Sequence, residues 1–231
     1  MEIVLIRHGQ PAWMHGEDYT LDPHLTELGQ EQAEQSSKSL NKSDFEELWV
    51  SDLIRARETL IPFEKNLNFN TTNVFSWLRE MQDEKEKALF GKSKEEIEEF
   101  FTRRNSRPLD EWVSNYHGEY IIKYRDNIVQ NLEKELSSRG INVVDKKIEK
   151  VFSIDNSDNR KILIISHAGT MSVLLSYFLD IPLFPWTWRR FLPIHCAHTS
   201  LRSAKIEGGY IFRMKKFNDT SFYSKGELLT Y

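Results

Sequence analysis

Short apolar runs punctuate this chain, and most of them are followed by a segment in which apolar residues have helical spacing. The runs are rich in β-branched or aromatic side chains and end at polar residues, which is typical of strands buried in a sheet. They are residues 3–6, 47–50, 71–78 and 161–165. We therefore expect four strands, each close to a helix in the sequence.

The segments between these runs carry helix signals. Thr26 can cap a helix that follows it, and Ser51 can cap a second helix with one apolar face. That face consists of Leu53, Ala56, Leu60 and Phe63. Residues 170–179 are helical in pattern, and residues from about 91 to 140 are helical and heavily charged. This charged region has no strand signal, so we interpret it as a helical insertion.

Two later strands are predicted at 200–206 and 208–217, joined as a hairpin near Gly208 and Gly209. Strands that alternate with helices indicate α/β layers. We predict a three-layer sandwich with a mostly parallel central sheet and helices on both faces. The sequence has no repeats and no low-complexity linker, which favours a single domain over residues 1–231 with the insertion, about 91–140, lying over the active site.

Composition and charge narrow the class of protein. The chain has 231 residues, 39% of them hydrophobic, which suffices for one sizeable core. Its 31 basic and 35 acidic residues give a net charge of −4, so we expect no nucleic-acid or anionic-membrane partner. The apolar runs are too short to span a membrane, and the start lacks signal-peptide features. The single cysteine, Cys196, excludes a disulfide framework, and we expect a cytoplasmic protein.

Two of the predicted strands end in a histidine that is closely followed by glycine. Because open α/β sheets bind ligands at the carboxyl ends of their strands, His8 and His167 can meet in one crevice. Arg7 precedes His8, and Arg55 points away from the apolar face of its helix. Guanidinium groups grip phosphate, the helix N-terminus after His167 favours anions, and neutral imidazole is a nucleophile. The strand ends therefore predict a phosphate site.

Five motifs reinforce this prediction. The stretches "LIRHGQ", "LTELGQEQA", "SDLIRARETL", "WLRE" and "ISHAGT" occur in this order, and the chain resembles the histidine phosphatase superfamily with its phosphoglycerate-mutase-like fold. The resemblance implies that His8 becomes a phosphohistidine while Arg7, Arg55 and His167 hold the phosphoryl oxygens. It also implies that Glu80 is the proton donor to the leaving group.

The sequence departs from the family pattern directly after Glu80. The family often has a glycine about four residues after this glutamate, whereas Gly91 here follows it by eleven residues. Glu84 or Glu86 could replace Glu80 as the acid if the loop is remodelled. We predict Glu80 because we expect it to close a strand, as the other candidate residues do.

Several other side chains are candidates for substrate contacts. Gln10, Gly169, Thr170 and His198 are predicted to bind substrate, although Gln10 could instead serve a turn and Thr170 a helix cap. The aromatic stretch 182–193 could form a lid or simply cover the core. Arg103, Arg104 and Arg107 could bind a second anion or form a solvated patch. The histidine spacing has no metal-ligand pattern, so we expect no metal and no cofactor.

Three functions fit these candidates. The first is hydrolysis of a small phosphorylated metabolite by a phosphomonoester phosphatase. The second is a phosphoglycerate mutase, whose Trp-Asn and Gly-Trp pairs after the RHG motif are missing here. The third is a catalytically silent module that binds partners, which would require an incomplete phosphate cage. We predict the phosphatase, and the sequence leaves the natural substrate and the oligomeric state, including a homodimer, open.

Overall fold

The computed structural model describes residues 1–12, 20–41, 45–69, 71–82, 92–93, 95–96, 99, 116–145, 149–155, 157–182, 190–224 and 226–230. Several predictions lie outside these residues. They concern Glu84 and Glu86 as alternative acids, the three arginines at 103, 104 and 107, and residues 183–189 of the aromatic stretch.

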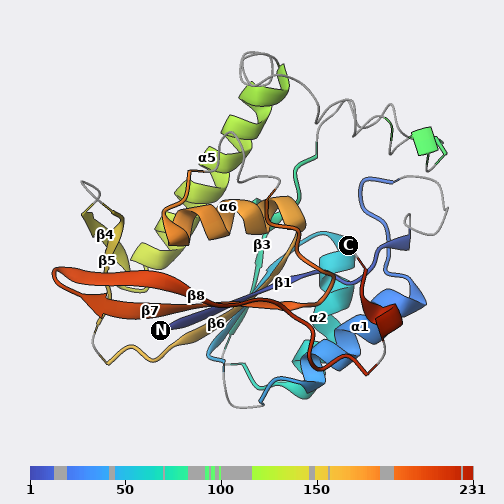
Figure 1. The fold of residues 1–231 in the computed structure, drawn as a ribbon, viewed down its shortest axis with the longest axis horizontal. Coiled ribbons are helices and arrows are strands. Elements are labelled where there is room, and N and C mark those ends of the chain that lie inside the picture. Colours follow the sequence, from blue (N-terminus) through green and yellow to red (C-terminus); the bar gives the residue numbers. More distant parts are fainter. Residues whose placement is uncertain are drawn as a thin grey trace.

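An eight-stranded mixed sheet forms the middle of the molecule (Figure 1). Its order is β3-β2-β6-β1-β7-β8-β5-β4. The strands are β1 (Glu2–Arg7), β2 (Glu47–Ser51), β3 (Thr71–Phe75), β4 (Asn142–Asp145), β5 (Val151–Ser153), β6 (Lys161–Ser166), β7 (His198–Ile206) and β8 (Gly209–Asp219).

The prediction of a mostly parallel sheet is wrong. In the described residues three pairings are parallel, β3–β2, β2–β6 and β6–β1, and four are antiparallel, β1–β7, β7–β8, β8–β5 and β5–β4. The physical reason is the short connections in the second half of the sheet. Ile206 pairs with Gly209, so only two residues link β7 to β8, and so short a link can join only antiparallel strands.

Helices cover both faces of the sheet, as predicted. They are α1 (Glu27–Lys38), α2 (Ile54–Asn66), α5 (Tyr116–Ser137) and α6 (Ala168–Leu179). Alternate residues of β1 face opposite sides: Val4 and Ile6 pack with the apolar residues of α2, whereas Ile3 and Leu5 share a core with α5 and α6. These two cores fix the position of β1 at the centre of the sheet. None of the described helices is long and apolar enough to cross a membrane.

Two predicted helix caps have different outcomes. The Thr26 cap is confirmed, because its Oγ1 accepts a hydrogen bond from the Gly29 backbone N–H at 2.9 Å. The Ser51 cap is wrong, since α2 begins after Leu53. Its first free amide, that of Ile54, donates to Asp22 Oδ1 at 2.9 Å from another loop. The Ser51 hydroxyl is thereby left for a different role.

Close backbone contact pins the turn that follows β1. A Cβ atom built on Gly9 would collide with the backbone of Gly29 in α1, and one built on Gly29 would collide with Gln10. Only glycine permits this approach. The turn that carries His8 is therefore held directly against the first helix.

Candidate active site

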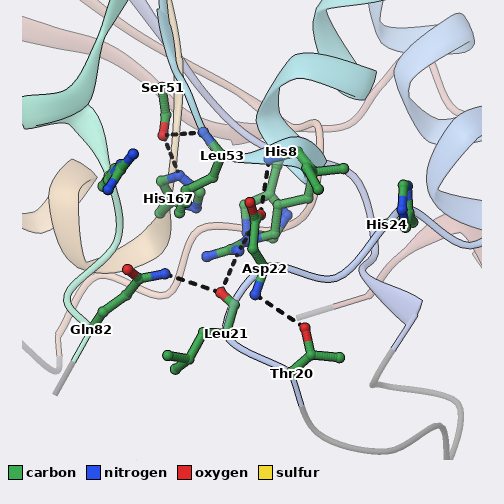
Figure 2. Close-up of polar contacts among 12 residues, drawn as sticks. His8, Thr20, Leu21, Asp22, His24, Ser51, Leu53, Gln82 and His167 are labelled. Atoms are coloured by element: carbon green, nitrogen blue, oxygen red, sulfur yellow. Dashed lines mark hydrogen bonds and ion pairs between the residues drawn. The ribbon is translucent and has the colours of Figure 1, made fainter. Parts of the chain in front are cut away.

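The carboxyl ends of β1, β2 and β6 bring chemically active side chains together. Arg7 ends β1 and His8 follows it, Ser51 ends β2, and His167 follows β6. The rings of His8 and His167 lie with their centroids 4.9 Å apart, and Figure 2 shows His167 beside Ser51. The structure thus brings together two histidines that are far apart in the sequence.

The contacts of His8 define its tautomer. Its Nδ1 lies 2.7 Å from the Gly9 carbonyl oxygen, which can only accept, so Nδ1 carries the proton. Its Nε2 accepts a hydrogen bond from Arg55 Nε at 3.3 Å and therefore has a lone pair on the side of Arg55. Burial lowers the pKa of His8 well below its usual value, and Arg55, His167 and Arg7 lower it further. His8 is thus a neutral imidazole whose Nε2 lone pair can attack once the Arg55 contact to it is released.

Two arginines flank this imidazole, Arg55 buried and Arg7 partly buried. Arg7 donates from Nη1 to the Pro193 carbonyl oxygen at 2.9 Å, while its buried Nε has no partner among the described residues. Burial lowers the pKa of Arg7 to about 10, so it still carries its charge at neutral pH. Arg55 donates to the Leu21 carbonyl oxygen at 3.1 Å and lies 3.4 Å from Asp22 Oδ1. Two fixed positive charges therefore lie beside His8.

The second histidine is held by a hydroxyl group. Ser51 Oγ accepts from the Leu53 backbone N–H at 3.3 Å and lies 2.9 Å from His167 Nε2 (Figure 2). The hydroxyl hydrogen can be donated to His167 Nε2, and in that arrangement the imidazole proton lies on Nδ1. That Nδ1 is buried and has no partner among the described residues. Burial, Arg55 and Arg7 lower the pKa of His167 well below its usual value, so it is a neutral hydrogen-bond donor.

Glu80 lies at the same edge of the sheet, but its position in the secondary structure differs from the prediction. It does not close a strand, because β3 ends at Phe75 and a 3-10 turn, Ser76–Leu78, intervenes. Its Oε2 accepts from the Gly169 N–H at the start of α6 at 3.1 Å, and its Oε1 accepts from the Met81 N–H at 2.9 Å. The carboxylate thus lies at the N-terminus of the helix that follows His167.

Helix α5, which lies within the predicted insertion, contacts this edge. The Tyr124 hydroxyl lies 2.6 Å from Thr170 Oγ1 and donates to Glu80 Oε1 at 3.4 Å. Tyr120 donates from its hydroxyl to the Gln82 carbonyl oxygen. Helix α5 therefore supports the segment that carries Glu80.

Unsatisfied donors give the site its chemical character. A buried polar group without a partner costs about 1–3 kcal/mol, and a buried guanidinium costs more. Arg7 Nε and His167 Nδ1 are such donors, and both lie around His8. A tetrahedral oxyanion would satisfy both donors and offset the positive charge. Within the described residues, no group of three or more histidine, cysteine or acidic side chains is arranged to hold a metal ion.

Sequence comparison agrees with this chemistry. A model of the histidine phosphatase superfamily (branch 1) matches residues 3–220. The chain belongs to the histidine phosphatase superfamily. A comparison with curated proteins gives no significant match.

Solved structures with this histidine phosphatase fold include several phosphatases. A mycobacterial glucosyl-3-phosphoglycerate phosphatase with inorganic phosphate is 22% identical, covers 96% of this chain and 99% of its own, and has a TM-score of 0.65. A phosphoserine phosphatase from Entamoeba histolytica with 3-phosphoglyceric acid is 17% identical, with coverages of 96% and 98% and a TM-score of 0.64. YhfR from Bacillus stearothermophilus is 19% identical, with coverages of 96% and 98% and a TM-score of 0.68. At these identities the likeness concerns the fold.

The remaining candidate residues of this chain lie around or away from the cluster. Gln10 Oε1 accepts from Thr26 Oγ1 at 3.0 Å, in keeping with the alternative turn role. Thr170 Oγ1 donates to the Arg79 carbonyl oxygen at 2.8 Å, and the Gly169 amide is bonded to Glu80. Two of the predicted substrate contacts, Gly169 and Thr170, therefore hold the Glu80 segment in this structure.

His198 is not brought to the cluster. It pairs with Ile6 in the antiparallel register of β1 and β7, and residues paired in this way face the same side of a sheet. Ile6 faces the core formed with α2, so His198 also faces that layer. Its Nε2 lies 2.8 Å from Ser36 Oγ in α1, and its ring stacks on Phe222 with centroids 4.5 Å apart.

The sequence interpretation missed three contributors to the cluster. His195, in the segment before β7, has its ring centroid 5.6 Å from that of His8. Ser51 was assigned to a helix cap, and Asp22 was not considered. The signal for Ser51 was present, because a residue at the end of a parallel strand lies at the ligand-binding edge. His195 and Asp22 lie in irregular segments, where spacing does not predict position.

Proposed function

We propose that this protein is a phosphomonoester phosphatase that hydrolyses a small phosphorylated metabolite through a phosphohistidine at His8. The observation that carries the proposal is the lone pair of His8 Nε2, which lies beside the Arg55 guanidinium in a neutral, buried imidazole. The phosphatases among the structural neighbours act, by their titles, on small phosphorylated molecules, which supports the same substrate class here.

The reaction divides into two transfers at one phosphorus atom. In the first, His8 Nε2 attacks phosphorus, the bond from phosphorus to the ester oxygen breaks, and Glu80 protonates the departing alcohol. Arg7, Arg55 and His167 stabilise the charge on the phosphoryl oxygens during this transfer. In the second, Glu80 takes a proton from water, the water oxygen bonds to phosphorus, and the nitrogen–phosphorus bond breaks.

The test is a screen of phosphate monoesters for release of inorganic phosphate, with a chromogenic aryl phosphate as the first substrate and EDTA present throughout. We expect turnover in EDTA, because two guanidiniums supply the positive charge, and an acid-labile phosphoenzyme after rapid quenching. His8→Ala should lose both. His24→Gln is the matched control, since His24 is an exposed histidine paired with Glu58 and should retain turnover.

Three outcomes would contradict the proposal. Phosphoenzyme in His8→Ala would exclude His8 as the nucleophile. Loss of turnover in EDTA with recovery on adding a divalent ion would indicate a metal-dependent mechanism. Isomerisation of a phosphoglycerate without net release of phosphate would indicate a mutase.

A further inference from the structure

We propose that His195 is a third imidazole of the phosphoryl site and donates a hydrogen bond from Nε2 to a phosphoryl oxygen. The inference rests on the proposed function, because it assigns a further contact in the same reaction. It comes from the geometry around one buried histidine that precedes the antiparallel strand β7.

The backbone places His195 against the first strand. Its residue forms an isolated bridge with Arg7, and the next amide, that of Cys196, donates to the Arg7 carbonyl oxygen at 2.9 Å. The imidazole is fully buried, and its ring centroid lies 5.6 Å from that of His8. His195 and His167 thus both adjoin the proposed nucleophile.

A chain of hydrogen bonds favours one tautomer of His195. The Gln10 backbone N–H donates to Gln32 Oε1 at 2.8 Å, and Gln32 Nε2 donates to the Leu228 carbonyl oxygen at 2.8 Å. These two partners leave one orientation for the Gln32 amide, so its Nε2 is also the donor to Thr230 Oγ1 at 2.7 Å. Thr230 then has its hydroxyl hydrogen for His195 Nδ1 at 2.8 Å. When that hydrogen is donated to Nδ1, the ring proton of His195 lies on Nε2.

His195 Nε2 is buried and has no partner among the described residues, and in this tautomer it is a donor. Burial and Arg7 lower the pKa of His195 well below its usual value, against a smaller opposing contribution from the Thr230 backbone, so the ring is neutral. His167 shows the same arrangement: a hydroxyl, that of Ser51, contacts one ring nitrogen, and the other ring nitrogen is buried and has no partner among the described residues. An oxyanion beside His8 would satisfy both imidazoles.

A purely structural role would use a different part of the residue. The contact between His195 Nδ1 and Thr230 ties the C-terminal segment to the sheet, and so does the Tyr223 hydroxyl, which donates to the His195 carbonyl oxygen at 2.7 Å. Neither tie requires a donor at Nε2. The experiment must therefore distinguish loss of the Nε2 donor from loss of the contacts with Thr230 and Tyr223.

The first measurement is the response of the wild-type protein to inorganic phosphate and to orthovanadate, followed by nitrogen NMR of the histidine rings. We expect the Nε2 resonance of His195 to remain protonated and to shift on saturation with either anion. A His195 resonance that does not change while the His8 resonance does would overturn the inference. This measurement needs neither turnover nor a variant.

The second measurement is the affinity for orthovanadate and the single-turnover rate of phosphorylation in four variants. His195→Leu should lose both by about 10- to 100-fold, because one preorganised donor to the transferring group is removed while the two arginines remain. His195→Gln should recover part of the loss, since its amide can donate. Thr230→Val should show a smaller loss, because it frees the ring orientation without removing the ring.

Tyr223→Phe is the matched control, since it also deletes one hydroxyl contact to His195 but leaves the imidazole in place. It should lower stability to denaturant while vanadate affinity changes less than about twofold. Equal vanadate affinity in wild type and His195→Leu would overturn the inference and leave the proposed function intact. Absence of phosphoenzyme in the wild type would instead refute the proposed function, and the NMR measurement would still decide the role of His195.

Discussion

The two halves of the sheet are built differently and contribute differently to the site. In the parallel half, β3, β2, β6 and β1 all run in one direction, so their carboxyl ends lie at one edge. In the antiparallel half, β7, β8, β5 and β4 alternate in direction. Three of the parallel strands end at or next to a residue of the cluster, and Glu80 follows the fourth after a short turn.

The difference shows how an antiparallel strand can still reach the site. Because β7 runs opposite to β1, the start of β7 lies at the carboxyl end of β1. The segment just before β7 therefore brings His195 beside Arg7, although no strand of this half ends at the cluster. A parallel strand contributes to this edge through its carboxyl end, whereas an antiparallel strand contributes through its start. Variants at this edge can therefore be compared with variants elsewhere in the sheet.

The largest effect is expected at Glu80, the carboxylate at the edge of the sheet that carries His8 and His167. Glu80→Gln should slow single-turnover phosphorylation by alkyl phosphates by about 10²–10⁴-fold, since an alkoxide leaving group needs a proton. An activated aryl phosphate should be much less affected in this step. The measurement is rapid-quench phosphorylation with both substrate types.

The matched control is a carboxylate in the parallel half of the sheet, at the end of the strands opposite to the site. Glu47 begins β2 and pairs with Arg139 at 2.7 Å, so Glu47→Gln should reduce stability without slowing phosphorylation. If Glu80→Gln phosphorylates at the wild-type rate on an alkyl phosphate while Glu84→Gln or Glu86→Gln does not, the acid lies in the loop after Glu80.

The next effect concerns stability in mild acid. His8, His167 and His195 have pKa values lowered mainly by burial, and burial lowers the pKa of His198 to about 4. Each binds a proton more readily in the unfolded chain, so each contributes stability above about pH 6.5 that is lost as the pH falls below it. Between pH 7.5 and pH 5.5 the loss is about 1.4 kcal/mol per histidine, or roughly 5 kcal/mol together.

Urea unfolding at the two pH values measures this loss. Replacing His198 with asparagine should remove about a quarter of it, because this residue lies outside the cluster but is also buried as a neutral ring. Saturating inorganic phosphate should raise the stability at both pH values, since the anion binds the folded chain alone. A stability that does not depend on pH in this range would show that the cluster does not hold neutral imidazoles.

The parallel half was largely predictable from the sequence, because buried runs and strand-end motifs have strong local signals. Arg7, His8, Arg55 and His167 were expected to meet, and the rings of His8 and His167 lie 4.9 Å apart. The antiparallel half was not predictable, since β4 and β5 have only four and three residues and leave no clear periodic pattern. Without the direction of β7, the sequence favoured His198, and the register turns that residue toward α1.

The smallest effect is expected at the far end of the antiparallel half, and on stability alone. A Cβ atom at Gly209 would lie 2.5 Å from the Phe152 carbonyl oxygen and 2.8 Å from Val151 Cγ1, so Gly209→Ala forces β8 away from β5. Overpacking of this kind costs about 1–3 kcal/mol in the free energy of unfolding.

Gly208→Asn is the control: Gly208 has a φ of +85° with nothing within 4 Å of a built Cβ, and asparagine tolerates positive φ values. Both variants should retain kcat/KM within about twofold, because the hairpin turn lies at the opposite end of β7 from His195. A large loss of turnover in a fully folded Gly209→Ala variant would mean that packing between β8 and β5 affects the site. The antiparallel half would then do more than hold the segment before β7 in place.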